Sequence, residues 1–355
     1  MGDYVYAGAA KWSAARSEDH GYGLFRLDPD VGEWEALGDR PKGGLPDTVG
    51  IHHLAFSQMD PSLLYAGTHA GPYKSQDGGD SWEALSLPTE NCVTWSLLPH
   101  PSDPNILYAG TEDQGVYRTT DGGKSWDALP VPKPEGYCYI GFPSRTVRMA
   151  LDPSNPDEIY VGVEVGGLLR SLDGGDSWED GGGDLFRLSK EEYPDFPDGK
   201  GDIVGMMDTH SVTCNPALPG TVFYANRFGL YRSDDKAQTF RNLDVGRFSH
   251  ITYSRDVQTS RHDPNRLYAA FSFASVSDEG SLWKSDDQGE SWQRFDHGVS
   301  VDSTMMHIAQ SPTNAERVYC GARRGQVFGT EDGGKSWREF RLPDGVEGLY
   351  AVAAV

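Results

Sequence analysis

Cysteine is scarce in this chain. The 355 residues include four cysteines, and no two of them form a Cys-x-x-Cys pair. Structural zinc sites and disulfide frameworks depend on cysteines at short, regular spacings. Neither is therefore expected to hold the fold together. We expect reduced, partly buried thiols at Cys92, Cys138, Cys214 and Cys320.

Long apolar runs are also absent. No stretch approaches the roughly 18 apolar residues that a membrane-spanning helix needs. The N-terminal sequence MGDYVYAGAA has no basic segment followed by an apolar segment, which is the pattern of a secretory signal. We therefore expect a cytoplasmic protein that does not take a membrane as its partner.

Basic residues are few. Lysine and arginine number 31 against 53 aspartates and glutamates, and the formal net charge is -22. A charge of this sign and size disfavours binding to nucleic acids. Because 37% of the residues are hydrophobic and 11% are aromatic, the chain has enough apolar side chain for a packed core. The expected partner is a small molecule, and the sequence leaves the oligomeric state open.

Glycine and proline are abundant, at 43 and 22 residues, which indicates many turns. Many of the glycines belong to an octapeptide with the frame Ser/Thr-x-Asp-x-Gly-x-Ser/Thr-Trp. Its five clean copies are SQDGGDSW (75–82), TTDGGKSW (119–126), SLDGGDSW (171–178), SDDQGESW (285–292) and TEDGGKSW (330–337). SDDKAQTF (233–240) and LDPDVGEW (27–34) are degraded copies.

A second repeated unit precedes each octapeptide, as in LYAGTHAGPYKS and LYAGTEDQGVYRT. Short aromatic and β-branched runs separated by glycine-rich turns predict strands, four in each repeat. Seven such repeats predict an all-β, seven-bladed β-propeller formed by one domain, 1–355. The C-terminal run 348–355 is expected to supply the inner strand of the first blade, which would close the ring and leave no free edge.

The octapeptides are Asp-boxes, and the chain resembles the Asp-box (BNR-repeat) β-propellers over essentially its whole length. That group includes sialidases, xyloglucan-degrading glycosidases, sortilin-type receptors and photosystem assembly factors. The resemblance implies a fold but no single function, because these propellers serve both catalysis and binding. We expect the box carboxylates to accept backbone N–H bonds within a tight turn, at Asp77, Asp121, Asp173, Asp287 and Asp332.

The inner strands place one equivalent residue per blade around the channel. Alignment on the downstream proline or on the Tyr-Ala-Gly strand gives His53, Ser96, Arg148, Ser211, His250, His307 and Tyr350. The preceding position includes Trp95 and His210. Neutral imidazoles are the commonest metal ligands. We therefore predict that a divalent transition metal (Zn, Fe, Mn or Cu) is bound by His53, His210, His250 and His307.

The turn after the second strand carries an ionisable residue in five of the seven repeats. These residues are His69, Glu112, Glu164, Arg227 and Arg323. Together with the inner ring they predict a polar funnel, and hence a hydrolase or lyase that acts on a small polar or anionic substrate in the channel. The predicted catalytic residues are Arg148, Glu164, Glu112, Tyr350 and His69. The predicted substrate-binding residues are Arg227, Arg323 and Trp95.

Two further functions and a purely structural interpretation stay open. A glycoside hydrolase needs two carboxylates, which Glu112 and Glu164 would supply from adjacent blades. A non-catalytic assembly or interaction propeller would instead have a channel filled by water or side chains. In that case the inner-strand histidines would simply form hydrogen bonds between blades. Sialidase chemistry is disfavoured, because the Arg-Ile-Pro motif is missing and sialidase catalytic domains have six blades.

Long insertions lie on the face where the site is expected. The segments 131–144 and 181–208 join consecutive blades and contain several aromatic residues. The loops 11–21 and 271–280 extend two turns on the same face. Loops of this length in a compact fold are usually functional. We therefore expect ordered lids over a small-molecule pocket.

Overall fold

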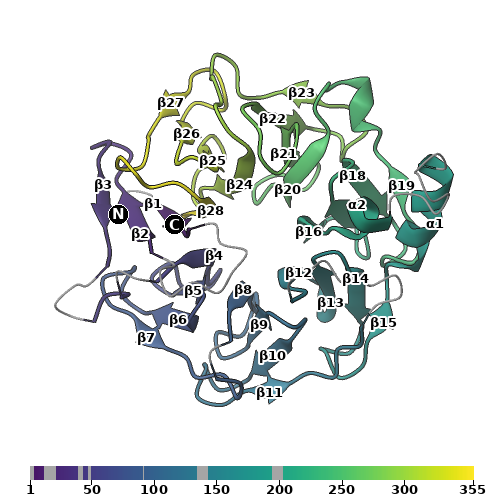
Figure 1. The fold of residues 1–355 in the computed structure, drawn as a ribbon, viewed down its shortest axis with the longest axis horizontal. Coiled ribbons are helices and arrows are strands. Elements are labelled where there is room, and N and C mark those ends of the chain that lie inside the picture. The colour runs from purple at the N-terminus through teal and green to yellow at the C-terminus, as the bar shows by residue number, and fades with distance from the viewer. Residues whose placement is uncertain are drawn as a thin grey trace.

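Seven four-stranded antiparallel sheets stand around a central axis (Figure 1). The computed structural model describes residues 4–11, 21–38, 43–46, 49–90, 92–133, 143–193 and 203–355. Each sheet begins with an inner strand beside the axis and continues outward in chain order. The first sheet is the exception, because its inner strand comes from the end of the chain. The chain is thus a seven-bladed β-propeller, as the repeats predict.

The first four blades contain the following strands. Blade 1 consists of β28 (Leu349–Ala354), β1 (Val5–Ala9), β2 (Gly23–Leu27) and β3 (Trp34–Ala36). Blade 2 consists of β4 (Ile51–Phe56), β5 (Leu64–Thr68), β6 (Gly71–Ser75) and β7 (Glu83–Ala84). Blade 3 consists of β8 (Thr94–Pro99), β9 (Leu107–Thr111), β10 (Val116–Thr119) and β11 (Asp127–Ala128). Blade 4 consists of β12 (Thr146–Asp152), β13 (Asn155–Val163), β14 (Gly167–Ser171) and β15 (Glu179–Asp180).

The remaining three blades follow the same order. Blade 5 consists of β16 (Ser211–Cys214), β17 (Val222–Ala225), β18 (Leu230–Ser233) and β19 (Arg241–Asn242). Blade 6 consists of β20 (Tyr253–Thr259), β21 (Leu267–Ser272), β22 (Gly280–Ser285) and β23 (Gln293–Arg294). Blade 7 consists of β24 (Met305–Gln310), β25 (Val318–Ala322), β26 (Val327–Thr330) and β27 (Arg338–Glu339).

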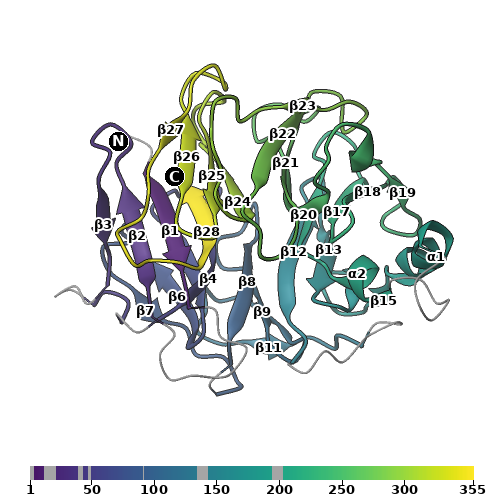
Figure 2. The same cartoon turned by 45° about the horizontal axis from the view of Figure 1, so that its top comes forward.

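The ring closes through β28, which pairs antiparallel with β1. Val5 lies opposite Ala354, and Gly8 lies opposite Ala351. The N–H of Tyr4 also donates to the carbonyl oxygen of Val355 at 2.9 Å. Figure 2 shows β28 beside β1 although the two strands come from opposite ends of the chain. The predicted closure is confirmed, and blade 1 has no unpaired inner edge.

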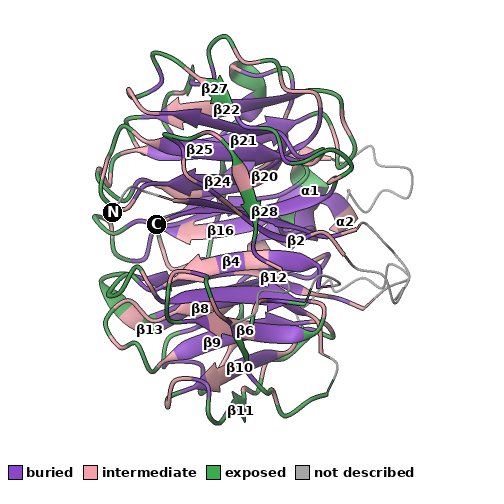
Figure 3. Ribbon diagram, turned by 90° about the vertical axis from the view of Figure 1, so that its left-hand side faces the viewer, coloured by how far each residue is buried: buried purple, intermediate pink, exposed green. Residues whose placement is uncertain are grey.

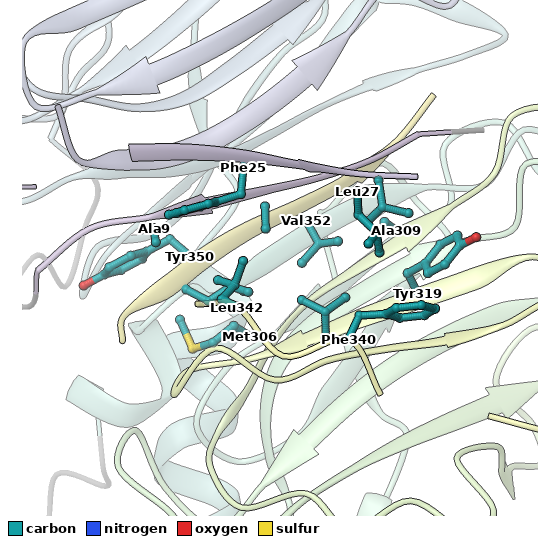
Figure 4. Packing of buried hydrophobic residues seen from close by; sticks show 14 of the residues in the cluster. Ala9, Phe25, Leu27, Met306, Ala309, Tyr319, Phe340, Leu342, Tyr350 and Val352 are labelled. Carbon is teal, nitrogen blue, oxygen red and sulfur yellow. The ribbon is translucent and has the colours of Figure 1, made fainter. Parts of the chain in front are cut away.

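Apolar side chains pack between the blades rather than in one central core. Seven clusters of buried residues occupy the seven blade-to-blade contacts. In the cluster that joins blades 7 and 1, Tyr319 and Phe340 belong to the same buried layer as Phe25 and Leu27 (Figure 4). Figure 3 shows the strands largely buried and the connecting loops more exposed. Each blade buries both faces, and so its strands lack a simple alternation of apolar and polar residues.

The glycine of the repeated Leu-Tyr-Ala-Gly strand allows neighbouring blades to approach closely. A Cβ atom at Gly110 would overlap the side chains of Ser96 and Thr146, and one at Gly162 would overlap Thr209. Thr146 and Thr209 begin or precede the inner strands of the next blades. In blades 3 and 4 this position therefore needs a residue without a side chain, whatever its backbone conformation, whereas Ala225 and Ala270 occupy it in blades 5 and 6.

The Asp-boxes form the hydrogen bonds that their residues predict. Ser171 Oγ donates to Asp173 Oδ1 at 2.8 Å, and the N–H of Ser177 donates to the same oxygen at 2.8 Å. The indole N–H of Trp178 donates to the carbonyl oxygen of Gly175 at 2.9 Å. The hydrogen bonds from Ser177 and Ser171 lower the pKa of Asp173 to about 2. The box carboxylates therefore stabilise turns.

The degraded copy at 233–240 forms the same turn. Asp235 accepts hydrogen bonds from Ser233 Oγ at 2.8 Å and from the N–H of Thr239 at 2.9 Å. Lys236 and Ala237 replace glycine, and they adopt left-handed backbone conformations with φ of 61° and 59°. The Ser, Asp and Thr positions thus preserve the turn without its glycines, at a conformational cost.

Two helices occupy the described part of the insertion 181–208. They are α1 (Gly183–Glu192) and α2 (Ile203–Met207). Leu185, Met206 and Met207 pack with apolar residues of blades 4 and 5. Figure 1 shows α1 at the periphery of the ring. This part of the insertion buttresses the blades and does not form the lid that we expected. None of the described helices is long and apolar enough to span a bilayer.

Other expected lid residues lie outside the described part of the chain. They include Tyr137, Tyr139 and Phe142 of the insertion 131–144, and Phe196 of the insertion 181–208. Most of the loop 11–21 lies outside it as well.

Candidate functional site

A ring of equivalent inner-strand residues divides the channel. The N–H of Leu97 donates to His53 Nδ1 at 3.2 Å, and the N–H of Ile308 donates to Asp256 Oδ2 at 2.8 Å. In each of these bonds the side chain of a ring residue accepts a backbone N–H of the next blade. That N–H belongs to the residue that directly follows the next blade's own ring residue. We call these positions the lower ring, which contains His53, Ser96, Arg148, Ser211, Asp256, His307 and Ala351.

The structure corrects two predicted ring positions. Asp256 occupies the place predicted for His250, and Ala351 occupies the place predicted for Tyr350. His250 lies outside the strands, with its side chain 73% exposed and Nε2 2.6 Å from Glu279 Oε1. The first hairpin of blade 6 is no longer than those of other blades, so its inner strand starts later than we predicted.

The predicted metal ring is not formed. His53 and His307 have ring centroids 6.2 Å apart, but His210 lies on the other side of the lower ring and His250 is exposed. No group of three His, Cys, Asp or Glu residues is arranged to hold a metal ion within the part of the chain that the structure describes. Burial and the charge of Arg148 keep the pKa of His53 well below its ordinary value. The inner-strand histidines instead form hydrogen bonds to neighbouring blades, as the structural interpretation predicts.

Below the ring lies a cavity of about 600 Å³, lined by inner strands and first hairpins. Its polar groups largely bind neighbouring blades. Ser211 Oγ donates to Asp256 Oδ1 at 2.8 Å, and Gln258 Nε2 donates to the carbonyl oxygen of Ile308 at 2.6 Å. Gln310 Nε2 similarly donates to the carbonyl oxygen of Thr259 at 3.1 Å. These groups stabilise the ring of blades and are largely committed to it.

Above the ring lies a smaller and more highly charged cavity of about 40 Å³, which we call the upper compartment. His52 and Trp95 stack there with ring centroids 4.0 Å apart, and the edge of Tyr350 lies 5.4 Å from His52. The guanidinium of Arg145 lies 4.2 Å from the Trp95 ring centroid. The complete lining is His52, Trp95, Arg145, Val147, Arg148, Glu164, Thr209, His210, Arg255 and Tyr350.

Two ion pairs with opposite orientation flank the upper compartment. Arg145 Nη1 lies 3.2 Å from Glu164 Oε2 in blade 4, and Arg227 Nε lies 2.6 Å from Asp208 Oδ2 in blade 5. His210 Nε2 lies 3.3 Å from the same oxygen of Asp208. Burial raises the pKa of Glu164 despite the opposing charge of Arg145, and the negative charge of Asp208 adds to the rise. Although burial opposes it, His210 and Arg227 lower the pKa of Asp208 to about 2.

The structure brings together some of the predicted site residues and separates others. Those that line the upper compartment are Arg148, Glu164, Tyr350, Trp95 and His210. Arg227 lies next to it through Asp208, and Arg323 is close enough for its charge to act on Tyr350.

Glu112 and His69 lie outside this lining. The N–H of Glu112 donates to the carbonyl oxygen of Val93 at 3.0 Å, and His69 Nδ1 accepts the N–H of Gly50 at 3.1 Å. The carboxylate whose charge raises the pKa of Glu164 is therefore Asp208, and not Glu112 as predicted.

Sequence reasoning missed Arg145, Asp208 and Arg255. The sequence does contain a signal for Arg255, because each ring residue of blades 2 to 7 lies twelve positions before an aromatic residue of the second strand. His53 precedes Tyr65 by this interval, and counting back from Tyr268 gives Asp256, with Arg255 before it. Arg145 and Asp208 both lie three residues before a ring residue, in segments that we interpreted only as insertions.

Comparisons with known proteins agree with this architecture. The family model described as "Sortilin, neurotensin receptor 3" matches residues 280–352. In a GH74 xyloglucanase of Xanthomonas campestris, 45% of the chain superposes on 81% of this one, with a TM-score of 0.62 and 17% identity. YCF48 of Cyanidioschyzon merolae superposes over 84% of its chain and 82% of this one, with a TM-score of 0.56 and 16% identity. The chain is a seven-bladed Asp-box propeller.

Curated relatives of this propeller are xyloglucanases. A xyloglucanase of Paenibacillus sp is 24% identical over an alignment of 312 positions, and the match covers 83% of this chain and 27% of that protein. An oligoxyloglucan-reducing end-specific xyloglucanase of Emericella nidulans is 26% identical over an alignment of 361 positions, and the match covers 92% of this chain and 39% of that protein. The Asp-box propeller thus spans only about a quarter to two fifths of the length of these relatives.

Proposed function

We propose that this propeller hydrolyses glycosidic bonds at its upper compartment, with Glu164 as general acid and Asp208 as the partner carboxylate. The observation that carries the proposal is a pair of neighbouring carboxylates whose surroundings shift their pKa values in opposite directions. Such a divergence separates the group that donates a proton from the group that stays ionised.

Each carboxylate suits one part of glycoside hydrolysis. Burial favours the protonated form of Glu164, which would donate its proton to the oxygen of the leaving sugar. Asp208 stays negative beside Arg227 and would stabilise the positive charge that develops on the sugar ring. The two groups come from adjacent blades, so the bond to be cleaved would lie across the boundary between blades 4 and 5.

The size of the compartment limits what enters it. A volume of about 40 Å³ is close to that of one or two water molecules. A sugar ring would therefore lie at the upper face, with only one substituent reaching into the compartment. The xyloglucanase relatives support a saccharide as the substrate class. They support no particular sugar, because the chain covers a minor part of each.

The experiment measures hydrolysis of a panel of neutral and acidic oligosaccharides, including xyloglucan oligosaccharides. Glu164→Gln and Asp208→Asn should each lower kcat/KM by about 10²- to 10⁴-fold, because each removes a group that acts in the transition state. Glu112→Gln is the matched control and should keep activity, since Glu112 neither lines the compartment nor acts on the pKa of Glu164 as Asp208 does. Equal losses in the three variants would contradict the assignment.

A non-catalytic interaction propeller is the second candidate. One observation favours it: YCF48 proteins match this chain over 82% to 84% of their own length, whereas the xyloglucanases match over less than half. One of these YCF48 structures is described as bound to D1 peptide. On this proposal the upper face would bind an extended segment of a partner protein, and the wild-type protein would turn over none of the oligosaccharides.

A further inference from the structure

Positive charge exceeds negative charge around the upper compartment. Arg145 and Glu164 neutralise each other, and Arg227 and Asp208 do the same. Arg148, Arg255 and Arg323 add three further positive charges, and the charge of Arg255 acts on both of the others. Although burial opposes it, Tyr253, Asp208 and Glu164 raise the pKa of Arg255. Asp256 of the lower ring is the carboxylate that offsets Arg148. Five guanidinium groups thus face three carboxylates among these residues.

Outside the two ion pairs, Arg148 and Arg255 each have a buried donor that lacks an acceptor among the described residues. The Nε atoms of Arg148 and Arg255 are buried and have no hydrogen-bond partner among the described residues. Arg148 uses Nη1 to donate to the carbonyl oxygen of Val147 at 2.8 Å. A guanidinium has five N–H donors, and a buried donor without an acceptor is costly. The buried Nε–H donors without an acceptor and the excess of positive charge favour the binding of an anionic hydrogen-bond acceptor.

Arg148 and Arg255 share a boundary of the compartment. Arg148 belongs to the lower ring and forms part of the lining of both cavities, whereas Arg255 lies in the position just before that ring. Burial, with the charge of Arg255 acting in the same direction, lowers the pKa of Arg148 to about 10. A bound anion would relieve this repulsion, and that gives the site affinity for a negative group.

The size of the compartment and the planar guanidinium groups favour a small, planar anion. A cavity of about 40 Å³ admits one small group, and a planar guanidinium matches a planar carboxylate. The hydroxyl of Tyr350 keeps its proton because burial raises its pKa, although its hydrogen bond with Arg323 acts in the opposite direction. The stacked rings of His52 and Trp95 form a flat aromatic wall.

We propose that the upper compartment binds the carboxylate of an acidic saccharide, such as a uronic acid, through Arg148 and Arg255. The anion site itself stands on these contacts, and its assignment to a sugar rests on the proposed function. A uronate carboxylate in the compartment would hold its sugar ring at the upper face, beside Glu164. The compartment thereby selects acidic over neutral sugars.

The test measures thermal unfolding of the full chain with D-glucuronate, D-glucose or sodium sulfate. Glucuronate at about a hundred times its Kd should raise the Tm by about 3 °C, and glucose at the same concentration should not. Arg255→Met should abolish the shift, measured against its own Tm without ligand. Arg255→Lys keeps the charge but not the planar fork, and should weaken binding at least tenfold.

Controls separate this proposal from the proposed function. Arg324→Gln should keep the full shift, because Arg324 lies on the same face but is exposed and donates to the carbonyl oxygen of Asp302. Glu164→Gln should bind glucuronate and fail to hydrolyse, so its turnover tests catalysis alone. An equal Tm shift in Arg255→Met, or with glucose, would overturn the anion site. An equal shift with sulfate would overturn its selectivity for a carboxylate.

Discussion

Arg227 Nε lies 2.6 Å from Asp208 Oδ2, in the place where blade 4 has Glu164 facing Arg145. The same two backbone positions of adjacent blades thus carry ion pairs of opposite orientation. Their surroundings differ as well, because Asp208 also contacts His210 and is almost fully buried. One repeated backbone geometry therefore yields one carboxyl group with a raised pKa and one with a lowered pKa.

The first prediction concerns folding stability at low pH. The pKa of Asp208 is about 2 in the folded protein and near 3.9 in an unfolded chain. This group therefore adds about 2–3 kcal/mol of stability above pH 4, which is lost as the pH falls from about 4 to 2. Asp208→Asn should lower the unfolding free energy by about that amount at pH 7 and flatten this part of the pH profile. Denaturant titrations at several pH values measure both effects.

Asp176→Asn is the matched control, because Asp176 is 69% exposed and pairs with Arg118 at the surface. Exposed pairs contribute only about 0–1 kcal/mol. A loss in Asp176→Asn as large as that in Asp208→Asn would contradict the prediction.

The second prediction concerns the pH dependence of hydrolysis. A general acid must be protonated, and Glu164 has a raised pKa, so kcat/KM should fall as the pH rises through that pKa. Asp208 must be ionised, so activity should persist on the acid side down to the pKa of Asp208, while the fold holds. In Glu164→Gln the alkaline decrease should vanish from the residual activity. An unchanged alkaline midpoint in that variant would assign the acid to another group.

The third prediction concerns the packing of neighbouring blades. Gly110→Ala should destabilise the protein by about 1–3 kcal/mol, because its Cβ would overlap Ser96 and Thr146. Gly183→Ala is the control, since a Cβ there would have no atom within 4 Å. Thermal unfolding of both variants checks the difference. Similar Tm values would show that the blades can separate without cost.

The fourth prediction concerns the Asp-box turn of blade 6. Gln288 has a left-handed backbone with φ of 60°, where the clean boxes of other blades have glycine. Gln288→Gly should stabilise the protein by about 0.5–1 kcal/mol by removing this strain. Gln288→Ala keeps the strain and loses the hydrogen bond to Asn265 Oδ1, so it should bring no gain. Denaturant midpoints compare the two variants. An equal gain in stability in both would show that loss of the Gln288 side chain, and not relief of backbone strain, stabilises the protein.

The repeats were enough to predict the architecture. Each Asp-box closes through hydrogen bonds between residues at most four apart, such as Asp173 and Ser177, so its sequence specifies its own turn. The closing strand was predictable too, because the last strand of the sequence has no blade of its own and the first blade lacks an inner strand. These features depend on local hydrogen bonds and on a regular spacing, and both are visible in a linear sequence.

The candidate site was only partly predictable. Glu164, Arg148, Tyr350 and Trp95 came from the correct strands and turns, but Asp208 and Arg255 were missed. An alignment error in blade 6 placed His250 in the ring instead of Asp256. In a strand, such errors move a side chain to a different face or off the strand altogether. The predicted histidine cluster failed for this reason and because His210 lies on the other side of the lower ring.

The sequence by itself determined seven blades, their closure and the structural role of the box aspartates, because these follow from contacts that each repeat makes internally or with its immediate neighbour. The tertiary structure alone decided which charges meet around the axis. Arg148 and Arg255 come from blades 4 and 6, yet both line the upper compartment. Closing the ring brings them into one low-dielectric space, where burial and charge balance set their chemistry.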